Sequence, residues 1–159
     1  MNVLFLCTGN SCRSILAEAT FNHLAPGGWR AMSAGSKPTG KVHPRSLALL
    51  EREGIAIDGY HSKSWDALPV TPDIVITVCS SAAGETCPAY LGPVLRTHWG
   101  VADPAHATGT DLEIDAAFMA AYRTLRRRIE AFIALPLQDL QQDGARLKLE
   151  LDRIGEQIR

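Results

Sequence analysis

The sequence predicts an α/β protein, with a four-stranded parallel sheet between layers of helices and an extra helix at the C-terminus. Two observations indicate this class. Short apolar runs alternate along the chain with longer segments of helical periodicity, a pattern typical of parallel sheets covered on both faces. The length of 159 residues also suits a single domain that is large enough to bury a real core.

Four segments are predicted to be strands because they are short, mainly apolar and bounded by loops or turn residues. In chain order, they cover residues 2–6, 29–33, 72–79 and 93–98. The first and third carry the clearest signals. Functional loops of an open parallel sheet lie beyond the carboxyl ends of its strands, so we expect the reactive side chains at that edge.

Helical periodicity predicts four further segments. In chain order, they cover residues 14–24, 43–53, 112–135 and 139–159. Glycine or proline follows each of the first three, as is common just past a helix end. The last segment carries a short stripe of leucine and isoleucine, which we expect to pack on its own domain rather than on a second chain.

Charge and hydropathy exclude several classes of function. The net charge of −1 gives no reason to expect a nucleic acid or an acidic membrane as partner. No apolar run approaches the roughly 20 residues that a membrane helix needs. The chain opens directly into a strand-like segment without a basic leader, and we therefore expect a cytoplasmic protein.

The four cysteines, Cys7, Cys12, Cys79 and Cys87, fit neither a disulfide framework nor a zinc site. A reducing compartment disfavours static disulfides and favours catalytic or metal-binding thiols. Neither sequential pair has the short spacing typical of zinc ligands, and the five histidines show no metal-ligand spacing. The sequence therefore predicts no metal and no cofactor.

The loop after the first strand is predicted to bind an oxyanion. It runs from Cys7 to Arg13 and opens the first helix, whose N-terminal amides attract anions. Gly9 permits a tight turn, Asn10 tolerates a left-handed backbone, and the Arg13 guanidinium can grip two oxygens at once. The expected oxyanion-binding residues are Thr8, Gly9, Asn10, Ser11, Cys12, Arg13 and Ser14.

The same loop is predicted to activate Cys7 as a nucleophile. The helix N-terminus and Arg13 should lower the pKa of the Cys7 thiol, since both stabilise a thiolate. The hydroxyls of Thr8 and Ser14 are available to donate hydrogen bonds to that thiolate. Cys12 is interpreted as part of the loop structure rather than as the redox partner of Cys7.

The string CTGNSCRS at residues 7–14 resembles the active-site loop of the low-molecular-weight protein tyrosine phosphatase fold. It is more similar still to the arsenate reductases built on that fold. The resemblance continues through SAG at residues 33–35, the Cys79 to Cys87 segment and HWGVADPA at residues 98–105. It implies a phosphatase-like domain over residues 1–136, with residues 137–159 as a helical extension of the same domain.

The resemblance implies reduction of arsenate to arsenite. Cys7 would attack arsenate while Asp103 acts as general acid, and Cys79 would then attack the Cys7 sulfur and expel arsenite. Cys87 would take over the oxidation as a Cys79–Cys87 disulfide, by thiol–disulfide exchange. Thioredoxin, or a glutaredoxin and glutathione system, would reduce that disulfide.

Two other functions use the same residues. A phosphatase acting on phosphotyrosine or small phosphomonoesters needs only Cys7, Arg13 and Asp103. An oxyanion-sensing module would bind its ligand without consuming thiols. Ala105 and His106 follow the Asp103-Pro104 pair, where phosphotyrosine phosphatases of this fold usually carry aromatic residues. The absence of aromatic residues here favours a small inorganic substrate. Phosphate or sulfate would compete with that substrate for the site.

Some thioredoxin-linked members of that family also bind a monovalent cation beside the active-site loop. Asn10, Glu18 and Ser33 match three of the ligands implied by the resemblance. Ser64 stands where the fourth, acidic ligand is expected, with Lys63 next to it. The chain therefore departs from the family pattern at this site.

Overall fold

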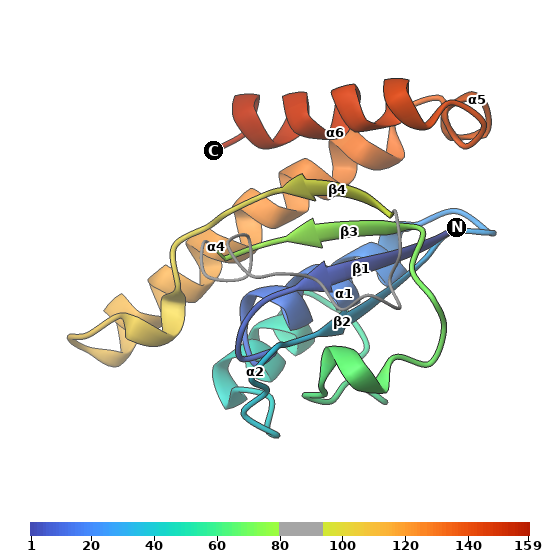
Figure 1. Cartoon of the computed structure of the whole chain (residues 1–159). Helices are drawn as coiled ribbons and strands as arrows, with labels where there is room; N and C mark the ends of the chain where they lie inside the picture. Colours follow the sequence, from blue (N-terminus) through green and yellow to red (C-terminus); the bar gives the residue numbers. More distant parts are fainter. Residues whose placement is uncertain (80–93) are drawn as a thin grey trace.

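The computed structural model describes residues 1–79 and 94–159. Within these ranges, four strands form one sheet in the order β2-β1-β3-β4, and every neighbouring pair is parallel (Figure 1). The strands are β1 (Asn2–Leu6), β2 (Arg30–Ala34), β3 (Ile74–Thr77) and β4 (Leu95–His98). The predicted parallel four-stranded sheet is confirmed, although β3 is shorter than expected and ends two residues before Cys79.

The central strands are buried on both faces of the sheet. Val3, Leu4, Phe5 and Leu6 of β1 are fully buried, as are Ile74, Val75 and Ile76 of β3. Successive side chains of a strand point to opposite faces, so a run of buried residues requires cover on both sides. Burial on both faces therefore explains why these strands appear in the sequence as continuous apolar runs.

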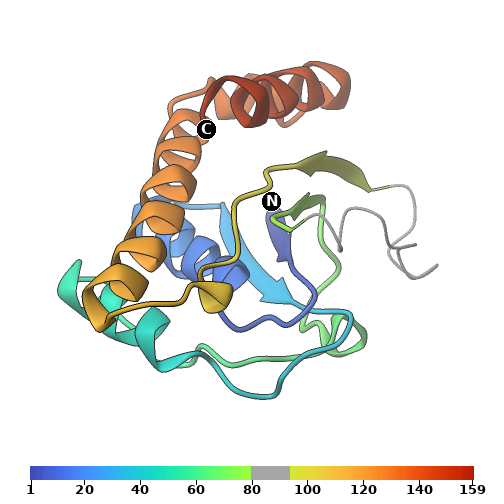
Figure 2. The ribbon, with the colours of Figure 1, turned by 90° about the vertical axis from the view of Figure 1, so that its left-hand side faces the viewer.

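The helices of the described residues follow the predicted order with small shifts at their ends. They are α1 (Arg13–Leu24), α2 (Pro44–Arg52), α4 (Asp111–Ile133), α5 (Leu137–Leu140) and α6 (Gly144–Gln157). Two short 3-10 turns, η1 (Trp65–Ala67) and η3 (Pro104–His106), were not predicted. Figures 1 and 2 show α1 and α4 side by side against the sheet, and α6 along the β4 edge.

A cluster of aromatic side chains fixes α4 in this arrangement. The Phe132 ring of α4 makes edge-to-face contacts with Phe21 of α1, Trp29 and Trp99, with ring centroids 5.5, 5.6 and 6.1 Å away. Phe5 of β1 closes the cluster against Phe21 and Trp99. Because Trp99 directly follows β4, the same cluster anchors the start of the loop that leads to Asp103.

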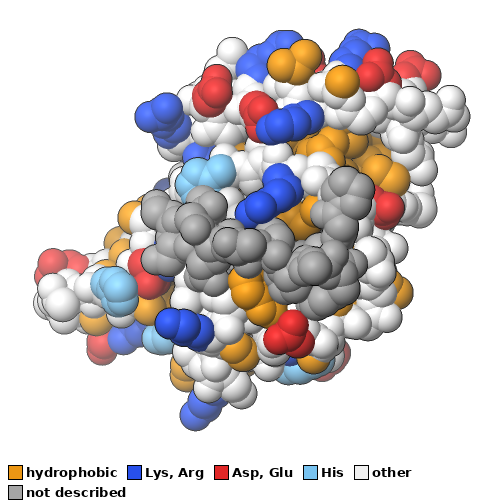
Figure 3. All heavy atoms as spheres, in the orientation of Figure 1, with side chains coloured by type: hydrophobic (Ala, Val, Ile, Leu, Met, Phe, Trp, Pro, Cys, Tyr) orange, Lys and Arg blue, Asp and Glu red, His pale blue; other side chains and the backbone are white. Residues whose placement is uncertain are grey.

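The prediction of one continuous C-terminal helix over residues 139–159 is wrong. The chain forms two helices, and the Asp143 side chain accepts a hydrogen bond from the Arg146 N–H to cap the start of α6. Leu147, Leu151 and Ile154 are buried, which confirms the expected packing on its own domain. Figure 3 shows cationic and anionic side chains interspersed on the outer side of this helix.

None of the helices in residues 1–79 and 94–159 is long and apolar enough to cross a membrane.

Candidate active site

The loop of residues 7–13, called the cradle loop below, connects the carboxyl end of β1 to the start of α1. Cys12 is the N-cap of α1, but its side chain makes no capping hydrogen bond, and the first turn contains no acidic residue. The first amides of α1 therefore lack a side-chain acceptor from the helix itself. Such amides, together with the helix dipole, form a site for an anion.

Asn10 holds the cradle loop in shape. It is fully buried, and its φ of 47° is the left-handed conformation expected of this residue. Its side-chain amide donates to the hydroxyls of Ser14 (2.8 Å) and Ser33 (2.9 Å), and its oxygen accepts from the Lys63 N–H (2.9 Å). Gly9 does not adopt a positive φ, so the left-handed residue of this loop is Asn10 and not the glycine.

Gly35 supports the cradle loop from the end of β2. A Cβ atom at this position would lie 2.4 Å from the carbonyl oxygen of Thr8 and 2.8 Å from that of Cys7. Only glycine allows this close approach of two backbones. Gly35 belongs to the SAG string at residues 33–35 but was not among the predicted site residues, although a glycine directly after a strand was an available signal.

Arg13 and Asp103 meet over the cradle, as expected from their places after β1 and β4. An Arg13 Nη2 to Asp103 Oδ2 distance of 3.2 Å makes an ion pair. Arg13 Nη1 also donates to the Val101 carbonyl oxygen at 3.1 Å, a backbone contact that no sequence signal could have indicated. Its Nε is buried and has no partner among the described residues, so the guanidinium retains a donor for an oxyanion.

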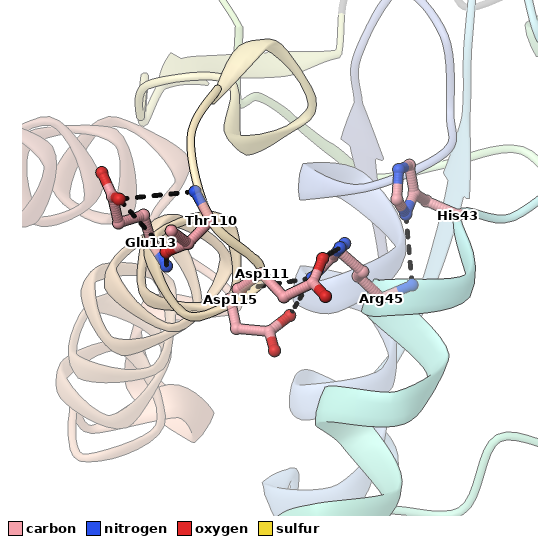
Figure 4. Close-up of polar contacts among 6 residues, drawn as sticks. All are labelled: His43, Arg45, Thr110, Asp111, Glu113 and Asp115. Carbon is pink, nitrogen blue, oxygen red and sulfur yellow. Dashed lines mark hydrogen bonds and ion pairs between the residues drawn. The ribbon is translucent and has the colours of Figure 1, made fainter.

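The loop that carries Asp103 spans residues 99–110 and is called the Asp103 loop below. Its far end is fixed where α4 begins, by contacts that Figure 4 shows. Thr110 and Glu113 form a capping box, and Arg45 of α2 bonds the carboxylates of Asp111 (2.8 Å) and Asp115 (2.5 Å). The Asp103 Oδ1 atom in turn accepts from the Ala105 N–H at 3.0 Å, which orients the carboxylate.

The α2 helix also contacts the cradle. The His43 N–H donates to the Ser11 carbonyl oxygen at 3.1 Å, and His43 Nδ1 accepts from the Arg45 N–H at the start of α2 (Figure 4). Burial lowers the pKa of His43, so the neutral imidazole that this capping role requires is favoured. The cradle loop thus contacts α2 directly, and the Asp103 loop is connected to α2 through the first turn of α4.

Cys79 lies beside Cys7, because β3 pairs with β1 and both cysteines follow the ends of their strands. The two thiols share a hydrogen bond, and Thr8 Oγ1 lies 3.6 Å from Cys79 Sγ. The Cys79 hydrogen bond and burial raise the pKa of Cys7, whereas Arg13 and the Gly9 backbone lower it. The expected net lowering is therefore wrong for this thiol–thiol arrangement.

Of the remaining two cysteines, Cys12 lies within the described residues and Cys87 does not. Burial raises the pKa of Cys12, whose thiol lies 3.9 Å from Ser11 Oγ. These contacts agree with a structural part for Cys12 in the cradle loop. Cys87 lies outside the described residues, so its predicted redox part stays a prediction.

The residues that match the cation site of the family do not fit a cation here. Ser33 Oγ donates to Glu18 Oε1 at 2.5 Å, and Asn10 already bonds Ser33 and the Lys63 N–H. The Ser64 hydroxyl accepts from the Asp66 N–H and so caps η1 instead of facing a cation. Burial raises the pKa of Glu18, which disfavours the charged ligand that a cation would need.

No group of three or more His, Cys, Asp or Glu side chains able to hold a metal ion occurs in residues 1–79 and 94–159.

The parallel sheet, the Cys7 to Arg13 loop on a helix N-terminus and the carboxylate facing it define a class of cysteine-dependent enzymes that act on tetrahedral oxyanions. The chain belongs to the low molecular weight phosphotyrosine protein phosphatase family, which it matches over residues 2–146.

Its relatives within this family point to one branch. An arsenate reductase of Halalkalibacterium halodurans is 39% identical over 131 residues, which cover 82% of this chain and 93% of the relative. A solved arsenate reductase in the phosphate binding state is 30% identical, with a TM-score of 0.69 over 84% of this chain and 96% of that one. A thioredoxin-dependent arsenate reductase of Corynebacterium glutamicum is 28% identical, with a TM-score of 0.55 over 81% and 61% of the two chains.

Proposed function

We propose that this protein reduces arsenate to arsenite. The observation that carries the proposal is the place of Cys79 beside Cys7 and Thr8, at the ends of the paired strands β1 and β3 and next to the oxyanion cradle. A phosphatase needs only the first cysteine, whereas a reductase needs a second sulfur within reach of it. The relatives described above, which are named as arsenate reductases, support the same assignment.

In the first step, the Cys7 thiolate attacks arsenic and forms a sulfur–arsenic bond. The proton that Cys7 loses passes to the Asp103 carboxylate once that group has left Arg13. One arsenic–oxygen bond then breaks, and the leaving hydroxide takes this proton from Asp103 to depart as water. The α1 amides and Arg13 bind the other oxygens as they gain charge. Since Asp103 holds Arg13 before the substrate arrives, arsenate must displace this ion pair, which releases Asp103 for proton transfer.

In the second step, the Cys79 thiolate attacks Cys7 Sγ and forms a disulfide. The sulfur–arsenic bond breaks with its electron pair left on arsenic, which is thereby reduced from arsenic(V) to arsenic(III). The two thiols supply the two electrons, and arsenite leaves the cradle. Thr8, whose hydroxyl touches Cys79 Sγ, is placed to support the attacking thiolate.

In the third step, the Cys87 thiolate attacks Cys79 Sγ, so that Cys7 is released and a Cys79–Cys87 disulfide remains. An external thiol donor then returns both cysteines to the reduced state. We assign this part to a thioredoxin, with a glutaredoxin and glutathione system as the second choice. The thioredoxin-dependent relative supports that order.

The decisive test is the Cys79→Ser variant in arsenate-dependent NADPH oxidation coupled to thioredoxin and thioredoxin reductase. We expect steady turnover to fall by about a hundredfold or more, because the adduct on Cys7 can form but cannot be reduced. Phosphate binding by the same variant is the control, since it reports an intact cradle. Steady turnover by Cys79→Ser would contradict the mechanism.

A second activity uses the same cradle. Cys7, Arg13 and Asp103 lie together without any need of Cys79, so hydrolysis of an aryl phosphate is expected as a weak side reaction. This activity should survive in Cys79→Ser. If the wild-type protein hydrolysed aryl phosphate far faster than it reduced arsenate, the chain would be a phosphatase instead.

A further inference from the structure

Arg128, in the last third of α4, is a buried cation that the proposed reaction does not use. Its side chain is 3% exposed, and none of the ion pairs within residues 1–79 and 94–159 includes it. Burial, with repulsion from Arg159 and Arg127, lowers its pKa. A buried charge without a carboxylate partner is unfavourable unless its hydrogen bonds do something that an apolar side chain cannot do.

The hydrogen bonds of Arg128 join two distant parts of the chain. Its Nε donates to the Ile158 carbonyl oxygen at 2.7 Å, and its Nη1 donates to the Gly100 carbonyl oxygen at 3.2 Å. The first acceptor lies at the end of α6, and the second lies at the start of the Asp103 loop. The planar guanidinium fixes the direction of both bonds, which a lysine ammonium would not do.

The helix α6 reinforces this connection. Trp99 Nε1 donates to the Leu151 carbonyl oxygen at 2.9 Å, and a Cβ atom at Gly155 would lie 2.7 Å from Trp99 Cδ1. The backbone of α6 therefore packs directly on the first residue of the Asp103 loop. The family match ends at residue 146, within the first turn of α6, so the loop is held by an element outside the matched segment.

The anchored part of the loop leads directly to the reacting groups. Gly100 directly precedes Val101, whose carbonyl oxygen accepts a hydrogen bond from the Arg13 guanidinium. Asp103, two residues after Val101, forms an ion pair with the same guanidinium. On the other side, the Val101 N–H donates to the Val78 carbonyl oxygen next to Cys79. The pocket between the loop and α6 is lined by both Asp103 and Arg128.

We propose that Arg128 is a positioning residue, which with α6 sets the Asp103 loop so that Asp103 and Arg13 meet an oxyanion in the cradle. This inference rests on the proposed function for its substrate, but aryl phosphate hydrolysis requires the same placement of Asp103. In this role, Arg128 touches neither the substrate nor Cys7. It acts through the carbonyl oxygen of Gly100.

The test is a double-mutant cycle of Arg128→Met with Asp103→Asn, followed through kcat for arsenate reduction and for aryl phosphate hydrolysis. We expect Arg128→Met alone to lower kcat about tenfold, with a smaller change in KM, because the general acid is displaced. In the Asp103→Asn background, the same substitution should have little further effect. Arg128→Lys should behave like Arg128→Met, since lysine keeps the positive charge but lacks the planar guanidinium that donates to both carbonyl oxygens.

The matched control is Arg127→Met, at the position that precedes Arg128 in α4. Arg127 donates to the Arg159 carbonyl oxygen, at the same end of the chain. Among the described residues, no hydrogen bond or ion pair joins it to the Asp103 loop. We expect its kcat to stay within about twofold of wild type. If Arg128→Met does not fold, Gly155→Ala serves as the second variant. The Cβ atom of the new alanine would push α6 away from Trp99 while the Arg128 side chain is retained.

Two outcomes would overturn the proposal. One is a wild-type kcat in Arg128→Met or, if that variant does not fold, in Gly155→Ala. The other is an equal loss of kcat in the Asp103→Asn background, which would mean that Arg128 supports the fold in general. Failure of the proposed function is a separate result, since it would show as an absence of arsenate reduction in the wild-type protein.

Discussion

At the scale of single residues, the Arg13 guanidinium is already paired with Asp103, the residue that we propose as general acid. The Asp103 carboxylate occupies one arm of Arg13, and the Val101 carbonyl oxygen occupies the other. An oxyanion must therefore compete with a negative charge that is already present. The residue that assists the reaction is thus expected to weaken binding of the substrate.

Asp103→Asn should consequently change binding and catalysis in opposite directions. Asparagine can still accept from the Ala105 N–H, but it removes the charge from Arg13. A partly buried ion pair is worth about 1 kcal/mol, so the Kd for phosphate should fall about fivefold. In contrast, kcat for arsenate should fall by about a hundredfold because the proton donor is lost.

Calorimetric titration with phosphate at constant ionic strength measures the first effect, and the coupled NADPH assay measures the second. Glu130→Gln is the control, since Glu130 pairs with Arg126 and not with Arg13. It should leave the Kd for phosphate within about twofold of wild type. An unchanged or higher Kd in Asp103→Asn would show that Asp103 does not compete for Arg13.

At the scale of secondary-structure elements, the cradle loop is shaped by contacts from three neighbouring segments. The segment after β2 approaches it through Gly35, the residues before η1 reach it through the Lys63 N–H, and α2 reaches it through the His43 N–H. The loop is therefore preorganised by its neighbours as well as by its own Asn10 side chain. Preorganised donors do not have to reorient when the substrate gains charge.

Gly35→Ala tests this preorganisation. The new methyl group would overlap the Thr8 and Cys7 carbonyl oxygens, and relief of that overlap must move the cradle loop. We expect a loss of about 1–3 kcal/mol in the free energy of unfolding, as for other overpacked sites. The loss of phosphate affinity should be about tenfold or more, because donors shift relative to each other. Urea unfolding and calorimetry measure the two effects.

Gly27→Ala is the matched control, because a Cβ atom there meets nothing within 4 Å. It should change neither stability nor phosphate affinity appreciably. If Gly35→Ala behaved like Gly27→Ala, the close approach of the two backbones would have no functional consequence.

At the scale of the whole molecule, the sequence predicted what depends on local patterns and missed what depends on tertiary contacts. The parallel sheet and the Cys7 to Arg13 loop follow from apolar runs, turn residues and residue spacing, and both were found. The overlap at Gly35 and the carbonyl contacts of Arg128 require knowledge of which backbones meet in space. The raised pKa of Cys7 likewise depends on the contact with Cys79 across β1 and β3.

The break in the C-terminal helix is a different kind of error, because a local signal was present. Asp143 directly before Gly144 is a good N-cap, yet the leucine stripe on either side predicted one continuous helix. The stripe itself was interpreted correctly as a packing face. Residues 137–159 therefore contribute buried side chains beside β4. Their assignment to the same domain stays a prediction.

A chain that ends at Pro136 should accordingly not fold stably. The removed segment contributes five buried side chains, Leu137, Leu140, Leu147, Leu151 and Ile154. Each is worth about 1.5–3 kcal/mol, so their sum is comparable to the total stability of about 5–15 kcal/mol of a domain. Urea unfolding should show a lost or strongly lowered transition, and the emission of the now exposed Trp99 should shift to longer wavelength.

Two substitutions within α6 separate this packing effect from the shortening of the chain. Leu151→Ala should lower the free energy of unfolding by about 2–5 kcal/mol because it leaves a cavity beside Trp99. Leu149→Ala, on the exposed side of the same helix, should be nearly neutral. If the shortened chain unfolded at the wild-type urea concentration, or if both leucine variants behaved alike, α6 would be an appendage and not part of the core.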